Sequence, residues 1–393
     1  MKLTIMLGLY MAMVAASLAL LSRFLRWAFP GRRLWPVPIC VTLLYLFPPV
    51  GALLPDGPAC WFFQRWGNVF MGYLLYFFGA LLIVWLGMLP ARIAHRRRNR
   101  MPWAPARAVA ALILAVLALG SVAINVLGWR TAHDVKVNRY EISREQMGQE
   151  EPLRIVLIAD LHMGVNSTPE LYREMTERIN EQQPDLVLVA GDLITSSYGA
   201  MERPEEYAEA LGGIRATYGV YAVYGNHDVD EPLLGGFTYV GAEKALRNPE
   251  LPRFLERCGW TVLTDEAVTV PELGGLTIVG RRDLARPGDG VRERASLEEL
   301  LSGIDRAAPV ILVEHEPAEL EKLSGLGVDL SLSGHTHDGQ IFPGNLLVRM
   351  LSPQACGKRQ WGDTTVVVTS GVGYYGPPIR VGTDSEIVVI DVN

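Results

Sequence analysis

Four long stretches without a charged residue constrain what the first third of this chain can fold into. They cover residues 3–22, 34–55, 66–91 and 108–129. About 20 consecutive apolar residues are enough for a helix to cross a lipid bilayer, so each stretch is long enough to be a span. A cleaved signal peptide is the alternative for the first stretch, but three more follow it and no convincing cleavage site is present. We therefore expect a transmembrane region with four spans over residues 1–129.

The basic residues between these stretches predict how the region is oriented. The first connecting loop and residues 92–100 of the third hold nine arginines, whereas the second loop holds only two charged residues, Arg65 and Asp56. Loops rich in Lys and Arg stay in the cytoplasm, so four spans would place the residues after 129 on the outer face of a bacterial inner membrane. Loss of the proline-rich second stretch from the span count would move them inside. The nine arginines are Arg23, Arg26, Arg32, Arg33, Arg92, Arg96, Arg97, Arg98 and Arg100.

The remainder of the chain is acidic. Residues 129–393 contain 24 basic and 41 acidic residues, a net charge of −17 with His neutral. We expect no nucleic-acid partner, because phosphate contacts need Lys and Arg. Residues 130–150 are polar and mixed in charge, which indicates a linker. From residue 153 apolar runs alternate with helical stretches, so we expect residues 151–393 to form an α/β or α+β domain with the sheet buried between helices.

Five apolar runs in this domain end in residues of metal-binding type. Sites in such folds gather beyond the carboxyl ends of strands. Five of the seven histidines lie beyond residue 150, and all five fall in these motifs. Each motif alone has an ordinary explanation as a turn, a helix cap or a core histidine, but five together predict a metal site. The motifs are Asp160-Leu161-His162, Gly191-Asp192, Gly225-Asn226-His227-Asp228, Glu314-His315 and Gly334-His335-Thr336-His337.

In this order, the five motifs resemble the pattern of the calcineurin-like metallophosphoesterases, which is D-x-H, G-D, G-N-H-[DE], H and G-H-x-H. The resemblance covers most of residues 151–393. Within that superfamily, His-Glu-Pro at 315–317 and Gly-Gln-Ile at 339–341 resemble the membrane-associated bacterial phosphodiesterase branch. The resemblance implies a four-layer αββα sandwich.

The resemblance also implies a role for each residue of the motifs. Two divalent ions would clamp a phosphoryl group, and a metal-bound hydroxide would attack it. Oxygen and imidazole ligands without thiolate indicate manganese, iron or zinc. His227 would lie off the metals and stabilise or protonate the leaving group, with Asp228 orienting it. Asp160, His162 and His337 would hold one metal, Asn226, His315 and His335 the other, and Asp192 would bridge both.

Other positions carry weaker predictions. Related members usually have Gly where this chain has Asp338; if that position needs a positive φ, Asp is among the better substitutes. Arg380 follows a Gly- and Tyr-rich loop and could either contact a substrate anion or pair with an acid at the surface. Arg281 and Arg282 are expected to be solvated. Cys258 and Cys356 could pair in an oxidising compartment or stay free.

The expected function is that of a membrane-anchored, two-metal hydrolase of phosphate esters, with diesters preferred over monoesters. Its partners would be the bilayer and a phosphoester substrate, with lipid-linked substrates included. One alternative is a UDP-2,3-diacylglucosamine-type pyrophosphatase of lipid A synthesis, although those enzymes typically carry Arg at the position of His227 and work at the cytoplasmic face. The other is a non-catalytic metal-binding membrane scaffold, although such domains usually lose ligands that this chain retains.

Overall fold

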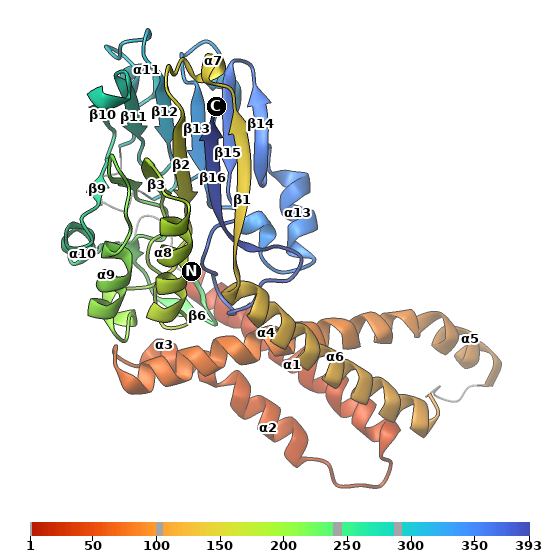
Figure 1. Ribbon diagram of the computed structural model, residues 1–393. Coiled ribbons are helices and arrows are strands. Elements are labelled where there is room, and N and C mark those ends of the chain that lie inside the picture. Colours follow the sequence, from red (N-terminus) through yellow and green to blue (C-terminus); the bar gives the residue numbers. More distant parts are fainter. Residues whose placement is uncertain (1, 100–104, 239–245, 287–292) are drawn as a thin grey trace. The chain divides into compact units, whose positions relative to one another are not determined.

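The computed structural model describes residues 2–99, 105–238, 246–286 and 293–393 (Figure 1). The chain divides into two compact units. The first contains residues Met1–Gly128 and the short segment Leu233–Tyr239; the second contains Trp129–Pro232 and Val240–Asn393. Arg100, which belongs to the arginine-rich third loop, lies outside the described residues.

The first unit is helical, and its helices have the length and apolarity that the sequence predicted. Four segments are long and apolar enough to cross a membrane: Leu7–Ala28, Pro36–Leu53, Pro58–His95 and Arg107–His133. Large apolar side chains such as Ile83 and Leu119 are exposed, as expected for helices that face lipid. The helices are α1 (Lys2–Ala28), α2 (Pro36–Tyr45), α3 (Phe47–Leu53), α4 (Pro58–Gly87), α5 (Leu89–Asn99) and α6 (Arg107–His133), the last of which ends in the second unit.

A β-hairpin from the middle of the chain completes the first unit. Its strands are β6 (Leu233–Leu234) and β7 (Phe237–Thr238), which pair antiparallel around Gly235 and Gly236. Both glycines have positive φ, which a tight two-residue turn of this kind requires. A Cβ atom at Gly235 would lie 3.8 Å from Met71 of α4 and 3.9 Å from Pro48 of α3. The hairpin therefore packs on the helices.

The second unit is built on two six-stranded sheets. The first has the strand order β1-β16-β2-β3-β4-β9 and the second has the order β10-β11-β12-β13-β15-β14. The first sheet contains β1 (Val135–Ile142), β16 (Ser385–Val392), β2 (Leu153–Ile158), β3 (Leu186–Ala190), β4 (Val220–Val223) and β9 (Thr261–Val262). The second contains β10 (Glu266–Val270), β11 (Leu276–Gly280), β12 (Val310–Val313), β13 (Leu330–Ser333), β15 (Thr364–Val368) and β14 (Gly357–Trp361).

The central strands are buried on both faces, which explains their unbroken apolar sequences. Leu188 of β3 and Ile311 of β12 pack in the core between the two sheets. Val187 of β3 faces an outer core with α8 (Pro169–Glu181), α9 (Pro204–Gly212) and α10 (Leu251–Arg257). Leu312 of β12 faces another with α11 (Leu297–Leu300) and α12 (Leu320–Leu323). The order is helix, sheet, sheet, helix, which confirms the mixed α/β, four-layer sandwich.

Short elements connect these layers. They are α7 (Arg144–Met147), α13 (Gly344–Leu351), the paired strands β5 (Val229–Asp230) and β8 (Leu246–Arg247), and the 3-10 turns η1 (Tyr198–Ala200), η3 (Pro271–Leu273) and η4 (His337–Gly339).

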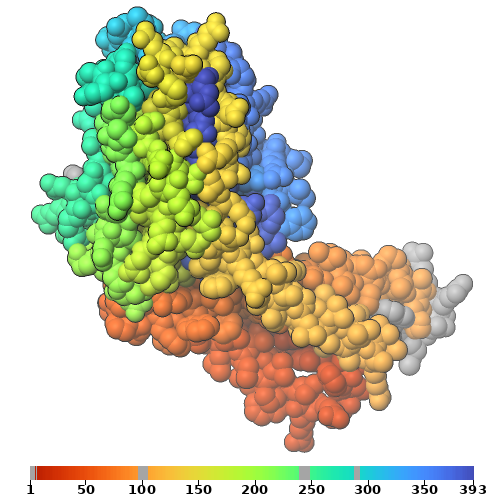
Figure 2. All heavy atoms as spheres, in the orientation of Figure 1, coloured from red at the N-terminus to blue at the C-terminus, as the bar shows by residue number. Residues whose placement is uncertain are grey.

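The sequence predicted a linker at residues 130–150, but most of these residues lie in helices and strands of the fold. Helix α6 continues to His133, and after Asp134 the chain enters β1, which pairs in parallel with β16 along its whole length. Strand β1 lies at the sheet edge, where only Val135 and Ile142 at its two ends are buried. Figure 2 shows its yellow atoms at the surface beside the dark blue of β16. An edge strand has few apolar positions, so its sequence resembled that of a polar connection.

Candidate metal centre

The five motifs of the sequence all follow parallel strands, and the two sheets bring them together. Strands β2, β3 and β4 are neighbours in the first sheet, and β12 and β13 are neighbours in the second. Because parallel strands end at the same edge of a sheet, residues that follow them meet there. The first sheet contributes Asp160, His162, Asp192, Asn226 and His227, and the second contributes His315, His335 and His337.

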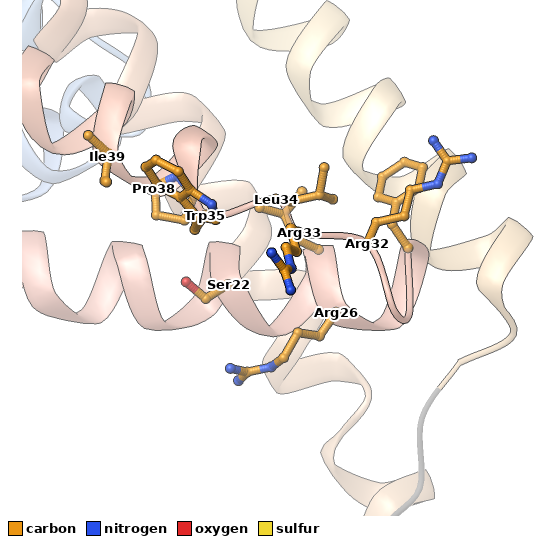
Figure 3. A pocket seen from close by; sticks show the side chains of 10 residues that line it. Ser22, Arg26, Arg32, Arg33, Leu34, Trp35, Pro38 and Ile39 are labelled. Atoms are coloured by element: carbon orange, nitrogen blue, oxygen red, sulfur yellow. The ribbon is translucent and has the colours of Figure 1, made fainter.

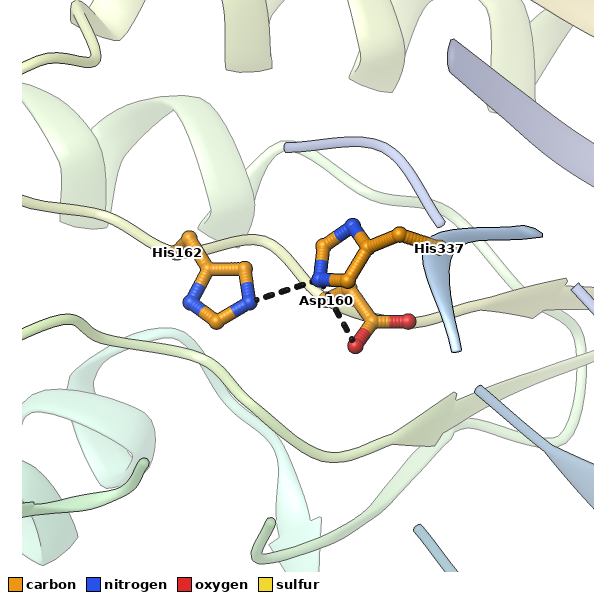
Figure 4. A group of neighbouring side chains, drawn as sticks. All are labelled: Asp160, His162 and His337. Atoms are coloured by element: carbon orange, nitrogen blue, oxygen red, sulfur yellow. Dashed lines mark hydrogen bonds and ion pairs between the residues drawn. The ribbon is translucent and has the colours of Figure 1, made fainter. Parts of the chain in front are cut away.

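One group of ligand atoms consists of Asp160, His162 and His337, whose ligand atoms lie within 4.8 Å of one another (Figure 4). The Nε2 atoms of His162 and His337 are 3.0 Å apart, and His337 Nε2 is 3.5 Å from Asp160 Oδ1. All three residues are buried. Imidazole nitrogens and a carboxylate that converge away from water form the donor set of a divalent transition-metal site.

A second group consists of Asp192, His315 and His335. His315 Nε2 lies 3.1 Å from Asp192 Oδ2 and 3.1 Å from His335 Nδ1. Asn226 joins them, because its Oδ1 atom lies 3.1 Å from His315 Nε2 and 3.0 Å from His335 Nδ1. This donor set also fits a divalent ion, with Asn226 contributing a neutral oxygen.

Asp192 lies between the two groups. Its Oδ2 atom is 3.1 Å from His315 Nε2 in its own group and 3.6 Å from His162 Nε2 in the other. Its Oδ1 atom accepts a hydrogen bond from the backbone N–H of His227 at 2.8 Å. The carboxylate is thus fixed between the two groups of donor atoms.

The backbone around the ligands is strained. Five of the seven proposed ligands have left-handed backbone conformations, which cost roughly 1–3 kcal/mol for a residue other than glycine and cluster at functional sites. The motif glycines are needed for close approach, because a Cβ atom at Gly225 would lie 2.2 Å from Asp192 Oδ1, and one at Gly334 2.5 Å from Asp160 Oδ2. The five residues are Asp160, His162, Asp192, His335 and His337.

Hydrogen bonds and burial prepare the imidazoles for metal binding. His315 Nδ1 lies 2.8 Å from the carbonyl oxygen of Ala190, and His162 Nδ1 lies 2.8 Å from Thr195 Oγ1. These contacts leave Nε2 of each ring directed at the centre. Burial lowers the pKa of His162 to about 3 and that of His335 to about 3, so both rings are neutral near pH 7, which is the form that binds metals.

Asp192 and His315 form an ion pair within the centre. Burial alone would raise the pKa of Asp192, but the neighbouring His315 and His227 hold it well below its usual range. Burial alone would lower the pKa of His315, but the carboxylate of Asp192 raises it well above its usual range. His315 therefore carries a proton that a cation bound in the same place would displace.

His227 lies beside the metal ligands without joining either group. Its Nδ1 atom is 2.5 Å from Oε1 of Glu231, whose other oxygen pairs with Arg286. Its ring packs against Tyr375, with the ring centroids 4.3 Å apart. Burial lowers the pKa of His227, but Asp192 and Glu231 outweigh burial and raise it. Glu231, Arg286 and Tyr375 were not among the predicted site residues, and the spacing of four residues between His227 and Glu231 was the only local signal.

Asp228 differs from the role that the resemblance implied. Its Oδ1 atom accepts hydrogen bonds from the backbone N–H groups of Leu193 and Ile194, and its Oδ2 atom accepts one from Gly225. The residue on the ring of His227 is Glu231. Asp228 instead ties together the turns that carry Asp192 and Asn226.

Arg380 is not at the surface, so the interpretation of this residue as a surface arginine paired with an acid is wrong. Its side chain is fully buried, and its guanidinium group donates to the carbonyl oxygens of Ser370, Gly371, Gly373 and Asp384. Burial lowers its pKa to about 10. The loop needs donors for these carbonyl groups, and Arg offers five N–H groups in one side chain. Arg380 therefore supports the loop from inside the unit, and its guanidinium group lies 3.3 Å from Nδ1 of His337.

The other weak predictions had mixed outcomes. Asp338 has a φ of 48° as expected, and its Oδ1 atom accepts a hydrogen bond from Arg349 Nε at 2.8 Å. Arg281 is not solvated, because it is buried and lies 2.9 Å from Oε2 of Glu319. Arg282 is likewise paired, with Asp265 at 2.8 Å. All four cysteines, including Cys258 and Cys356, are free.

Residues 153–339 match the family model described as calcineurin-like phosphoesterase. The matched residues include both groups of metal-binding side chains described above and most strands of the two facing sheets. The chain therefore carries a calcineurin-like metallophosphoesterase domain.

Several curated proteins are similar to this chain. A transmembrane protein with metallophosphoesterase domain from Danio rerio is 33% identical over 72% of this chain and 61% of its own length. An uncharacterised metallophosphoesterase from Helicobacter pylori is 31% identical over 65% of this chain and 63% of its own length. A third, from Aquifex aeolicus, is 29% identical over 66% of this chain and 92% of its own length. The chain spans less than two thirds of the length of the first two relatives.

The shared position of Asp192 leads to a prediction about metal content. The full-length protein should bind about two transition-metal ions. Asp192→Asn should weaken both sites, because it removes the charge that both groups face. Asp160→Asn should mainly affect one site, so it is the matched control. Metal content measured by mass spectrometry of the purified variants distinguishes them. Retention of both metals and full turnover in Asp192→Asn would show that Asp192 is not shared.

The contact between His227 and Glu231 predicts a pH effect. Glu231 raises the pKa of His227, so Glu231→Gln should lower that pKa. If a protonated His227 is needed for turnover, the fall in kcat on the alkaline side should move to lower pH in the variant. Glu209→Gln removes an exposed carboxylate from α9 and should leave the profile unchanged. An alkaline limb at the same pH in Glu231→Gln and the parent protein would contradict the prediction.

Proposed function

We propose that the protein is a membrane-anchored, binuclear metal-dependent phosphoesterase that hydrolyses phosphodiesters. The observation that supports this most is the position of Asp192 Oδ2, within 3.6 Å of a ligand nitrogen in each of the two groups. Two divalent ions of manganese, iron or zinc, when bound there, supply positive charge to the phosphoryl oxygens and lower the pKa of a water molecule.

The side chains around the centre have separate tasks in this reaction. Asp160 and Asp192 supply the negative charge that holds cations in a buried place. Glu231 occupies Nδ1 of His227, which leaves Nε2 as the nitrogen that can give a proton to a leaving group. An alkoxide released from a phosphodiester needs such a proton. His227, as a buried proton donor next to the proposed ligands, therefore favours hydrolysis of esters whose leaving groups are poor.

Two observations weigh against the alternatives. A sugar-nucleotide lipid pyrophosphatase of the kind considered above typically has Arg where this chain has His227, and here the histidine has its own carboxylate partner, Glu231. A non-catalytic scaffold would be expected to lose ligands, whereas all seven proposed ligands converge on the two groups. Hydrolysis of phosphate esters remains the function that the geometry supports best.

The membrane location is supported by four apolar helices and by relatives that are named transmembrane proteins. Together these suggest a membrane protein. We infer further that the second unit lies on the outer face of a bacterial inner membrane. At the turn between α1 and α2, Arg26, Arg32 and Arg33 line a pocket of about 420 Å³ (Figure 3). Residues 1–128 contain a single acidic residue, Asp56, so the positive charges of these arginines need water or lipid headgroups around them. Loops with several Arg residues stay in the cytoplasm.

A change at His227 tests the proposed chemistry. His227→Ala should retain the metal content, because His227 belongs to neither ligand group, while kcat falls by roughly 10²–10⁴-fold as for loss of a general acid. The loss should be smaller for nitrophenyl esters, whose leaving groups need no proton. An equal loss across leaving groups would exclude proton donation, and metal loss would make His227 a ligand.

The orientation predicts which segments a protease reaches. Protease added to spheroplasts should cut within residues 151–393 and spare the arginine-rich loop at residues 92–100, since four spans place them on opposite faces. Immunoblots with tags at the C-terminus and in the third loop would report each segment. A C-terminal unit protected until the inner membrane is lysed would contradict the orientation and favour the pyrophosphatase.

A further inference from the structure

Helix α13 exposes an apolar face that the metallophosphoesterase chemistry does not explain. Within the described part of the second unit, five of the seven exposed large apolar side chains fall in residues 342–351. Single exposed apolar residues are ordinary, but a concentration of them marks a binding surface. The five are Phe342, Leu346, Leu347, Met350 and Leu351, which are 47%, 50%, 57%, 80% and 82% exposed.

These side chains lie on one side of the helix. Leu346, Leu347, Met350 and Leu351 have the spacing of one helical face. The opposite side is fixed to the unit: Asn345 is buried and donates to the carbonyl oxygen of Gly382. Helix α13 therefore cannot turn its apolar face inward without losing its attachment. In Figure 1 it lies at the margin of the unit, beyond β14.

Helix α13 is attached to the turn η4, which contains the proposed metal ligand His337. Arg349 of α13 binds the carboxylate of Asp338, the residue after the ligand His337. A Cβ atom at Gly339 would lie 2.5 Å from the backbone of Asn345, so the helix and the turn η4 are in close contact. A surface that binds α13 is thus only one turn of chain from a metal ligand.

Basic residues accompany the apolar face. The side chain of Arg349 is 55% exposed. Arg359 is exposed and donates to the carbonyl oxygen of Pro353, two residues after the end of α13. An apolar face flanked by Arg is the pattern of helices that lie in the interface of a bilayer, with apolar side chains among the acyl chains and charges at the phosphates.

Connectivity also favours a bilayer over a protein partner. Only Asp134 separates α6, a candidate membrane span, from the first strand of the unit, so the unit is tethered directly to a segment that we propose crosses the bilayer. A second copy of the chain is disfavoured by area. A stable protein interface needs about 1,200–2,000 Å² of buried surface, which a helix about 12 Å long cannot supply alone.

We propose that α13 is an interfacial helix that inserts its apolar face into the bilayer, and that the substrate is a phosphoester carried in a lipid headgroup. The substrate assignment rests on the proposed function. Because α13 is fixed to the turn that carries His337, its insertion brings that side of the metal centre to the layer of headgroup phosphates. Lipid phosphoesters in the bilayer then reach the centre in preference to soluble ones.

The docking is tested with full-length protein in nanodiscs of phosphatidylglycerol and phosphatidylcholine. A nitrobenzoxadiazole amino acid replaces Leu347 in one variant and Glu209, exposed on α9, in the control. Doxyl-labelled lipids should quench the probe at position 347 and leave the probe at position 209 unchanged. Equal quenching of the probes at positions 347 and 209 would overturn the docking. It would also be overturned if the parent protein formed a dimer that dissociates in the variant L347D/M350D, because the apolar face would then bind a second copy of the chain.

The substrate class is tested with L347D/M350D and the matched variant L347F/M350F, which keeps the face apolar. Turnover of phosphatidylglycerol in nanodiscs should fall by about tenfold in the Asp variant, because insertion depends on buried apolar area. Turnover of soluble bis-nitrophenyl phosphate should be unchanged, and the Phe variant should match the parent protein. An equal loss on both substrates would make α13 a structural support only and overturn the assignment. A parent protein inactive on both would overturn the proposed function, while quenching would still decide the docking.

Discussion

The structure depends on the crowding of electron-rich atoms in a buried place. Two imidazole nitrogens face each other at 3.0 Å, and carboxylate oxygens lie within 3.6 Å of them. Lone pairs this close repel unless protons or cations lie between them. The protein holds them there with strained backbone at five ligands, glycines without room for a side chain, and the hydrogen bonds of Asp228 and Arg380. Cation binding converts this repulsion into attraction.

The centre lies where the two sheets meet. The first sheet supplies both carboxylates and Asn226, whereas the second supplies three of the four ligand histidines. Neither sheet alone offers a complete donor set for either ion. The distance between the sheets is set by the core that Leu188 and Ile311 share with their neighbours. Packing in this core therefore acts on ligand distances as directly as a change in a ligand would, because interiors are too dense to yield locally.

The convergence of the seven proposed ligands could be predicted because each follows an apolar strand, and the resemblance to the family then assigned each residue to a metal. Their supporting residues could not. Arg286 reaches Glu231 from a loop 55 residues away, and Arg380 is polar in sequence yet fully buried. Strand β1 was not predicted, because it pairs with one neighbouring strand and is buried only at its two ends. Its sequence therefore lacks the alternation of apolar and polar residues that marks a strand. Contacts made by long side chains across the fold leave no local periodicity.

The segment Leu233–Tyr239 belongs to the helical unit. The protein is therefore not simply a metal-binding domain joined to a separate membrane anchor. The chain leaves the metal-binding unit shortly after Glu231, contributes β6 and β7 to the helical unit, and returns. Leu233 and Leu234 are buried there. A gene fusion that exchanged residues 1–128 for another anchor would leave this hairpin without its packing surface. The helices and the hairpin must therefore evolve together, although more than 100 residues of chain separate them.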